Sequence, residues 1–195
     1  MSEKTLEAVK YLYGCIMVET EANLLYTIAT QRLPCPELST ITIALAQDNQ
    51  KHAKMIKELC RPLHEMCFNP SDLAKEFKKI SIEIDKLKDD ITPLVTIDKE
   101  EIGDFLKSLT NLEDCLHNLY ANFLQSTLFS NFAEALYEAS NITEDNLSYI
   151  IEAIKKDNLQ HRNMLIESLY HYHKATQKNI EPSIKYQNPD SWIRY

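Results

Sequence analysis

The stretch DNQKHAKM at residues 48–55 decides the fold, because it returns as DNLQHRNM at residues 157–164. A second pair precedes each copy, since Glu19 and Tyr26 recur as Glu113 and Tyr120 at the same spacing. A repeat of this kind defines the structural unit, so we expect a helix pair, a connection and a second helix pair. Five upstream positions recur in the same register: Leu38/Leu147, Ser39/Ser148, Ile41/Ile150, Ala44/Ala153 and Leu45/Ile154.

The composition predicts one helical domain. The chain has 195 residues, of which 44% are hydrophobic and only two are glycine, so it can form a sizeable core and favours helix. Its formal net charge of -8 argues against a nucleic-acid partner, which would need a basic face. The absence of a long apolar run and of a signal-peptide pattern predicts a cytoplasmic protein without a membrane partner. Five scattered cysteines indicate reduced thiols.

Helical periodicity places the repeated residues on inward faces. The first helix should run from Thr5 to Arg32 and stop at the sequence LPCP, because prolines break helices, and the second should run from Glu37 to Cys60. The second helix has a seam with three-four spacing at Leu38, Ile41, Leu45, Asp48, His52, Met55 and Leu59, and the last helix repeats it at Leu147, Ile150, Ile154, Asp157, His161 and Met164. We therefore expect both aspartates to face inward, as Glu19 and Glu113 do.

The two hairpins should differ in one respect. Residues at one level of an antiparallel pair are equidistant from the turn, and the midpoint of residues 19 and 52 falls at the LPCP turn. The midpoint of residues 113 and 161 falls at Tyr137, whereas the turn signals lie at residues 140–143. A continuous helix would misplace these two levels by roughly 12 Å. The sequence therefore predicts an interruption between Gln125 and Thr143.

Two segments lie outside the repeat. Residues 71–91 have heptad spacing at Leu73, Phe77, Ile80, Ile84, Leu87 and Ile91, which predicts an amphipathic helix in the connection. This helix could pack across the bundle of its own chain or form an intermolecular coiled coil. Residues 174–195 predict an extended tail in which Trp192 and Tyr195 could anchor on a neighbouring surface, after a bundle domain of residues 1–173.

The acidic and histidine side chains that are expected to face the core predict a metal site. Buried carboxylates need protons, partners or a cation, and four carboxylates are expected in the core together with two histidines: Glu19, Asp48, Glu113 and Asp157, with His52 and His161. Carboxylates with two imidazoles suit iron, manganese or zinc. His117, one turn after Glu113, could be a further metal ligand or could form a hydrogen bond at the edge of the bundle.

On these residues the chain resembles the ferritin-like superfamily, specifically the rubrerythrin-like carboxylate-bridged di-iron proteins. The resemblance implies an all-α, ferritin-like four-helix bundle made of two duplicated hairpins, with the additional amphipathic helix in the long connection. It also implies roles for three pairs of residues: the terminal glutamates Glu19 and Glu113, the ligand histidines His52 and His161, and the tyrosines Tyr26 and Tyr120 beside the site.

The chain departs from this family at one pair of positions. Three residues before each histidine, where the family has a bridging glutamate, stand Asn49 and Asn158. The preceding Asp48 and Asp157 match positions where relatives keep an aspartate bonded to the opposite histidine, or they could turn inward as ligands. The change allows two interpretations: a reshaped site with one or two metal ions, or a metal-free relic held by hydrogen bonds.

The leading expectation is a homo-oligomeric, dimeric protein with a non-haem iron, manganese or zinc site that reacts with dioxygen or peroxide, as an oxidase or peroxidase would. This chemistry is implied by the resemblance alone. The alternative is a metal-free bundle that acts as an oligomeric scaffold or partner-binding module through the connecting helix and the aromatic tail.

Overall fold

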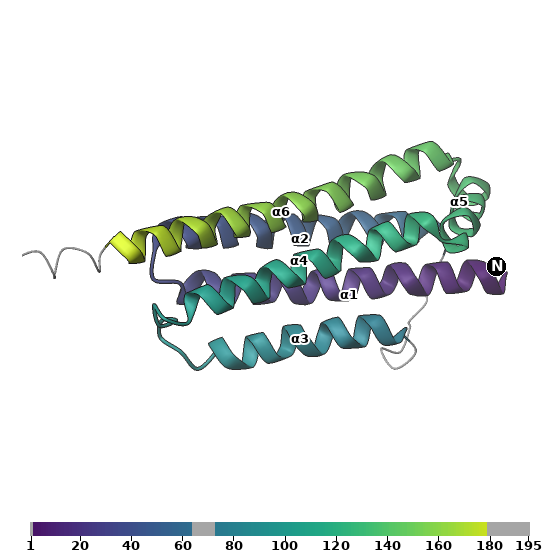
Figure 1. Cartoon of the computed structure of the whole chain (residues 1–195). Coiled ribbons are helices and arrows are strands. Elements are labelled where there is room, and N and C mark those ends of the chain that lie inside the picture. Colours follow the sequence, from purple (N-terminus) through teal and green to yellow (C-terminus); the bar gives the residue numbers. More distant parts are fainter. Residues whose placement is uncertain (1, 64–72, 179–195) are drawn as a thin grey trace, which may run out of the picture.

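The computed structural model describes residues 2–63 and 73–178, and this part of the chain consists of helices and their short connections, without a strand (Figure 1). Helices α1, α2, α4 and α6 lie lengthwise beside one another, α3 covers one side, and α5 closes one end. The elements in chain order are α1 (Glu3–Arg32), α2 (Pro36–Cys60), the short 3-10 helix η1 (Arg61–Leu63), α3 (Lys75–Ile91), α4 (Ile102–Gln125), α5 (Thr127–Ser140) and α6 (Glu144–Lys178).

The first hairpin forms as the prolines predict. Ser2 caps α1 by accepting a hydrogen bond from the Thr5 backbone at 3.1 Å. The helix ends at Arg32, and α2 begins with Pro36 in the first turn, where a proline costs no hydrogen bond. Helices α1 and α2 pack against each other along their length, as α4 and α6 do in the second hairpin.

The second hairpin contains the predicted interruption. Helix α4 ends at Gln125, Ser126 is extended, and α5 begins at Thr127 in a new direction (Figure 1). Asn141 then reverses the chain in the left-handed conformation, with a φ of 57°, which asparagine tolerates. The Thr143 hydroxyl accepts a hydrogen bond from the Asn146 backbone in the first turn of α6. The extra residues of the second half are therefore accommodated in α5.

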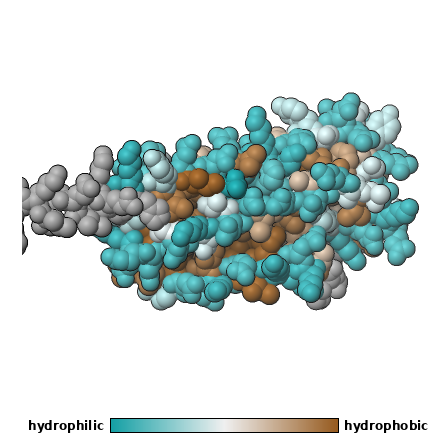
Figure 2. Space-filling view, viewed as in Figure 1, coloured by the Kyte–Doolittle hydropathy of each residue, from teal (hydrophilic) through white to brown (hydrophobic). Residues whose placement is uncertain are grey.

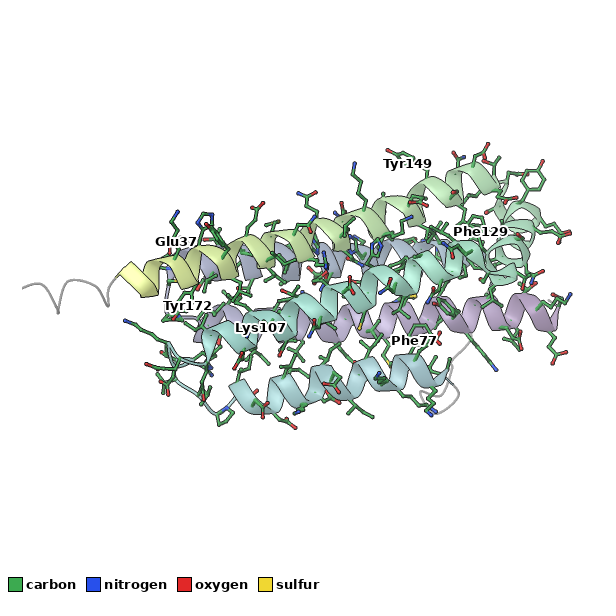
Figure 3. All side chains as sticks on the ribbon, viewed as in Figure 1. Glu37, Phe77, Lys107, Phe129, Tyr149 and Tyr172 are labelled. Carbon is green, nitrogen blue, oxygen red and sulfur yellow. The ribbon has the colours of Figure 1, made fainter. Side chains whose placement is uncertain are left out.

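The connecting helix packs on its own chain. The buried residues Phe77, Ile80, Ile84 and Ile91 of α3 face the bundle, where α3 contacts mainly α1, and Phe77 points toward α1 in Figure 3. The apolar seam of α3 is thus satisfied within one chain, which confirms the first of the two interpretations of this helix. Helix α3 begins at Lys75, whereas the prediction placed its start at residue 71. Residues 71 and 72 lie outside the described part.

The inward seams of α2 and α6 agree with the predicted ones at alternate positions and are shifted by one residue at the others. In α2, Leu38, Leu45, His52 and Leu59 are buried as predicted, but Thr42, Asn49 and Ile56 are buried in place of Ile41, Asp48 and Met55. In α6, Leu147, Ile154 and His161 are buried as predicted, and the shifted positions are Ile151, Asn158 and Leu165. The prediction that Asp48 and Asp157 face inward was therefore wrong, because these side chains are 37% and 36% exposed. Each helix turns its buried face mainly toward its hairpin partner, and α2 and α6 contact each other sparsely.

The C-terminal segment and the cysteines are described only in part. Helix α6 continues to Lys178, so the prediction of an extended tail from residue 174 was wrong for residues 174–178. Residues 179–195, with Trp192 and Tyr195, lie outside the described part. The four described cysteines, Cys15, Cys35, Cys60 and Cys115, are all free, as expected.

The face of the molecule seen in Figure 2 is mostly hydrophilic, with apolar side chains visible along its middle. None of the described helices combines the length and the apolar character that crossing a membrane requires.

Candidate metal centre

The middle of the bundle contains a layer of buried polar side chains. Six residues of the two hairpins are at most 3% exposed: Glu19 on α1, Asn49 and His52 on α2, Glu113 on α4, and Asn158 and His161 on α6. We call these six residues the polar layer. The structure therefore brings together the four predicted ligands, although Glu19 and His161 are 142 positions apart in the sequence. The inward asparagines take the places predicted for Asp48 and Asp157.

Two tyrosines bind the glutamates across the hairpins. Tyr26 of α1 donates to Glu113 Oε1 at 2.5 Å, and Tyr120 of α4 donates to Glu19 Oε1 at 2.8 Å. Burial, and then the nearby glutamates, raise the pKa of both phenols well above the usual value. Both tyrosines therefore remain neutral donors, which leaves one oxygen of each glutamate, Oε2, for another partner.

The histidines are held from the opposite hairpin in the same way. His52 Nε2 lies 3.2 Å from Asp157 Oδ2, and His161 Nε2 lies 3.1 Å from Asp48 Oδ2. The expected contact between each aspartate and the opposite histidine is therefore present. An ionised aspartate can only accept, so each Nε2 is the donor and the other ring nitrogen, Nδ1, faces the layer. This is how proteins fix the tautomer of a histidine that binds metal.

Lys51 connects the two aspartates, which the sequence analysis did not anticipate. Its ammonium lies 2.8 Å from Asp48 Oδ1 and 3.2 Å from Asp157 Oδ2, at the exposed edge of the polar layer. Burial disfavours both ionised carboxylates, but Lys51 and the histidines outweigh it and lower the pKa of each aspartate. The three-residue spacing from Asp48 was a signal for one of these ion pairs. The repeat has Gln160 at the position of Lys51, so this bridge exists once.

Each hairpin also brings a histidine close to its own glutamate. His52 Nδ1 lies 3.6 Å from Glu19 Oε2, and His161 Nδ1 lies 3.3 Å from Glu113 Oε2. Burial favours the neutral rings, yet the facing carboxylates outweigh it and raise the pKa of both histidines. Burial likewise raises the pKa of Glu113, against the opposing effect of His161 and Tyr26. In each of these groups burial disfavours the charged form, and the facing group of opposite charge favours it.

The polar layer is incompletely paired. Buried polar atoms nearly always have hydrogen-bond partners, yet seven atoms of the layer find none within the described protein. These atoms are Glu19 Oε2, Glu113 Oε2, His52 Nδ1, His161 Nδ1, Asn158 Oδ1, and both Oδ1 and Nδ2 of Asn49. Four of these atoms face each other in the two histidine–glutamate ion pairs, at 3.3 and 3.6 Å, without meeting hydrogen-bond geometry. Six of the seven are able to donate a lone pair to a cation.

This donor set suits a divalent metal ion, although it is not fully assembled. Among the described residues, no group of three or more His, Cys, Asp or Glu side chains is positioned to hold a metal ion as it stands. The donors form two carboxylate–imidazole pairs, completed by amide oxygens. Two ligand atoms on one ion are about 3.0–3.4 Å apart at metal–ligand distances near 2.1 Å, so each pair at 3.3–3.6 Å is close to chelating geometry. A small inward movement would suffice.

His117 lies beside this layer rather than in it. Its Nδ1 lies 3.0 Å from the backbone oxygen of Lys155, and the equivalent Asn23 donates to the Ala46 oxygen at 2.7 Å in the other hairpin. Both side chains therefore fasten helices within a hairpin. This confirms the interpretation of His117 as an edge residue.

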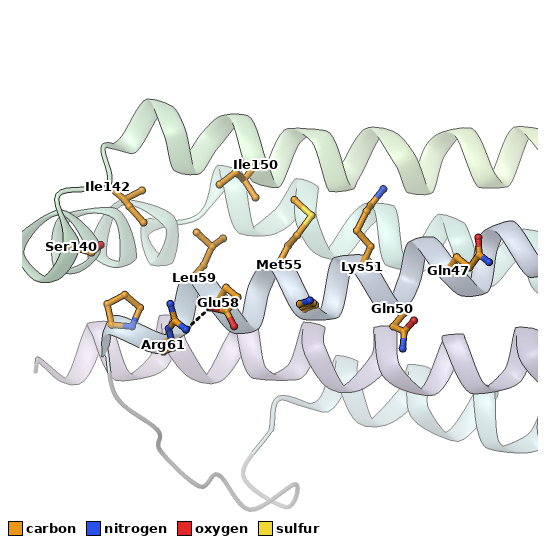
Figure 4. A pocket seen from close by; sticks show the side chains of 12 residues that line it. Gln47, Gln50, Lys51, Met55, Glu58, Leu59, Arg61, Ser140, Ile142 and Ile150 are labelled. Atoms are coloured by element: carbon orange, nitrogen blue, oxygen red, sulfur yellow. Dashed lines mark ion pairs between the residues drawn. The ribbon is translucent and has the colours of Figure 1, made fainter.

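A groove reaches the edge of the polar layer. It has a volume of about 1030 Å³ and lies between α2 and the beginning of α6, where these helices are apart (Figure 4). Its walls include the apolar residues Met55, Leu59 and Ile150. Lys51 belongs both to this groove and to the bridge between the aspartates. The groove therefore connects solvent with the rim of the layer.

No family model, curated protein or solved structure matches this chain.

Proposed function

We propose that this chain is a ferritin-like metal-binding protein with a divergent non-haem site in the bundle core. Glu19, His52, Glu113 and His161 would be the principal ligands, and iron, manganese and zinc are the ions that this donor set suits. The observation that carries the proposal is the cluster of unpaired lone-pair donors in a layer that excludes solvent. The duplicated arrangement, with a Glu and a His from each hairpin, supports the resemblance to the ferritin-like superfamily.

The surrounding residues support this role. The tyrosines hold the glutamates, and the aspartates hold the histidines, so all four ligands are oriented before an ion arrives. When bound, a redox-active ion would supply the oxygen or peroxide chemistry that the family resemblance implies. The adjoining groove, with Lys51 in its wall, offers a route for small reactants. An oxidoreductase activity is the corresponding enzymatic proposal.

The alternative function is a metal-free scaffold or partner-binding module. The packing of α3 on α1 weakens it, because the heptad face that would bind a partner is already buried. A homodimer is also part of the proposal, and only the resemblance to the family supports it.

Thermal unfolding with and without metal tests the proposal. An ion at about 100 times its Kd stabilises the folded state by about 2.7 kcal/mol, which corresponds to a rise in Tm of roughly 5–10 °C for a chain of this size. We expect such a rise with Fe(II) under anaerobic conditions, Mn(II) or Zn(II). The double variant His52→Ala/His161→Ala should lose it.

The matched control is His117→Ala, which removes a histidine that bonds to backbone at the bundle edge. This variant should keep the full metal response. Equal metal responses of the wild type and the double variant would exclude the two histidines as ligands, and a wild type indifferent to all three metals would favour the scaffold.

A further inference from the structure

We propose that the polar layer binds one divalent ion rather than two, and that Asn49 and Asn158 set this limit. The inference rests on the proposed function and specifies it further. It follows from three properties of the described side chains: the number of free donor atoms, the carboxylate oxygens already in use, and the charge of the layer.

The free donors are sufficient for one ion. Each glutamate offers Oε2, each histidine offers Nδ1, and each asparagine offers Oδ1, which together make six atoms without a hydrogen-bond partner among the described residues. Six nitrogen and oxygen donors complete one octahedral ion. Two ions would have to share the same six atoms, with three for each.

The carboxylates are not free to bridge. A carboxylate that joins two ions uses both of its oxygens, but Oε1 of Glu113 is bonded to Tyr26 and Oε1 of Glu19 is bonded to Tyr120. Asn158 Nδ2 adds a second contact to Glu19 Oε1 at 3.5 Å. An amide has a single good lone-pair oxygen and no charge, so Asn49 and Asn158 cannot replace a bridging carboxylate. No side chain of the polar layer is thus available to join two ions.

The charge of the layer also matches one ion. Two glutamates carry a charge of -2 when ionised, while the neutral histidines and asparagines carry none, so one divalent ion is balanced in a site without solvent. A second divalent ion would leave two uncompensated positive charges. Asp48 and Asp157 do not change this result, because both are more than a third exposed and share the Lys51 ammonium.

The spacing of the two imidazoles agrees with a shared ion. Their ring centroids are 6.1 Å apart with planes inclined by 22°. A bound nitrogen lies about 2.1 Å from the ion and about 1.1 Å from its ring centre, so two rings on one ion can be separated by up to roughly 6.4 Å. One shared ion would therefore lie between the two rings, with the histidine nitrogens on nearly opposite sides of it.

Elemental mass spectrometry after metal loading and desalting tests this inference. The full chain is loaded with Mn(II), or with Fe(II) under anaerobic conditions, and the metal-to-protein ratio is measured. We expect one ion per chain for the wild type. The variant Asn49→Glu/Asn158→Glu adds two buried carboxylates at the limiting positions, so its ratio should rise twofold, to two.

The matched control is Gln50→Glu/Leu159→Glu, which adds the same charges one position further along each helix, where both side chains are exposed. Its ratio should remain one. A wild-type ratio of two would overturn this inference and leave the proposed function intact, whereas a ratio of zero would overturn both. If the Asn49→Glu/Asn158→Glu variant folds, by circular dichroism, and still takes one ion, the role of the amides is excluded. If it does not fold, the wild-type ratio decides.

Discussion

The two hairpins are nearly identical where they meet the polar layer and differ most in what covers them. Each supplies one tyrosine, one glutamate, one histidine and one aspartate in the same contacts with its partner. Outside the layer, α1 is covered by α3 and α5, whereas the second hairpin has a break between α4 and α5. The comparison teaches that the geometry of the layer is maintained in both halves while the surrounding packing has no such constraint.

The largest expected loss of stability comes from the packing of α3 on α1. Phe77 is fully buried, and its ring lies 4.9 Å from that of Tyr11 in an edge-to-face arrangement. We expect Phe77→Ala to lower the free energy of unfolding by about 3–5 kcal/mol, because it leaves a cavity between α3 and α1. Chemical denaturation measures this loss. The neighbouring Ile82→Ala, at a position that is 65% exposed, should change stability by less than about 0.5 kcal/mol.

The next largest effect on stability compares Gly14 of α1 with the equivalent residue of α4. A Cβ added at Gly14 would lie 2.7 Å from the Phe77 ring, so Gly14→Ala should destabilise by about 1–3 kcal/mol even though alanine favours helix. The equivalent residue of α4 is Ser108, whose hydroxyl bonds to the backbone of its own helix. Ser108→Ala should be nearly neutral.

A coupled measurement tests the cause. In a Phe77→Ala background the steric conflict is absent, so Gly14→Ala should become stabilising by about 1 kcal/mol. An unchanged loss in that background would contradict the contact as the reason for the glycine.

The tyrosines test the likeness of the two halves. Tyr26→Phe removes the hydroxyl that donates to Glu113 Oε1, and a buried acceptor without a donor costs about 1–3 kcal/mol. Tyr120→Phe should cost less, since Asn158 also donates to Glu19 Oε1. Denaturation of the metal-free protein measures both, with the exposed Tyr149→Phe as control. A larger loss for Tyr120→Phe than for Tyr26→Phe would contradict these hydrogen-bond assignments.

The smallest effect removes the asymmetry at the rim. Lys51→Gln makes the first hairpin like the second, which has Gln160, and removes two ion pairs of a lysine side chain that is about half exposed. The expected loss is only about 0.2–1 kcal/mol, and it should shrink at high salt because solvent ions screen such pairs. Unfolding measured at low and high salt checks both points. A loss that is large and independent of salt would place Lys51 inside the polar layer rather than at its edge.

The sequence predicted the helices and the inward position of Glu19, His52, Glu113 and His161. Helix boundaries followed from the prolines at 34 and 36, and the break after Gln125 followed from the requirement that Glu113 and His161 lie at one level. That requirement is geometric, because the rise per residue of a helix is fixed.

The sequence did not predict which of two adjacent residues faces inward. Asp48 and Asn49 both lie within one turn of His52, and apolar residues occur on both possible seams of α2. The decision depends on the gap between α2 and α6, which leaves Asp48 and Asp157 at an open edge. Interhelix separation is a tertiary property, so the periodicity of one helix does not contain it. The Lys51 contact with Asp157 across this gap was missed for the same reason.

The most direct test of the central claim is the metal content of two single variants, His52→Ala and His161→Ala, after loading with Mn(II) or anaerobic Fe(II). If one ion is shared by both hairpins, each variant should lose most of the metal, and to a similar extent, because each removes one of the same six donors. Wild-type metal content in either variant would contradict a shared site.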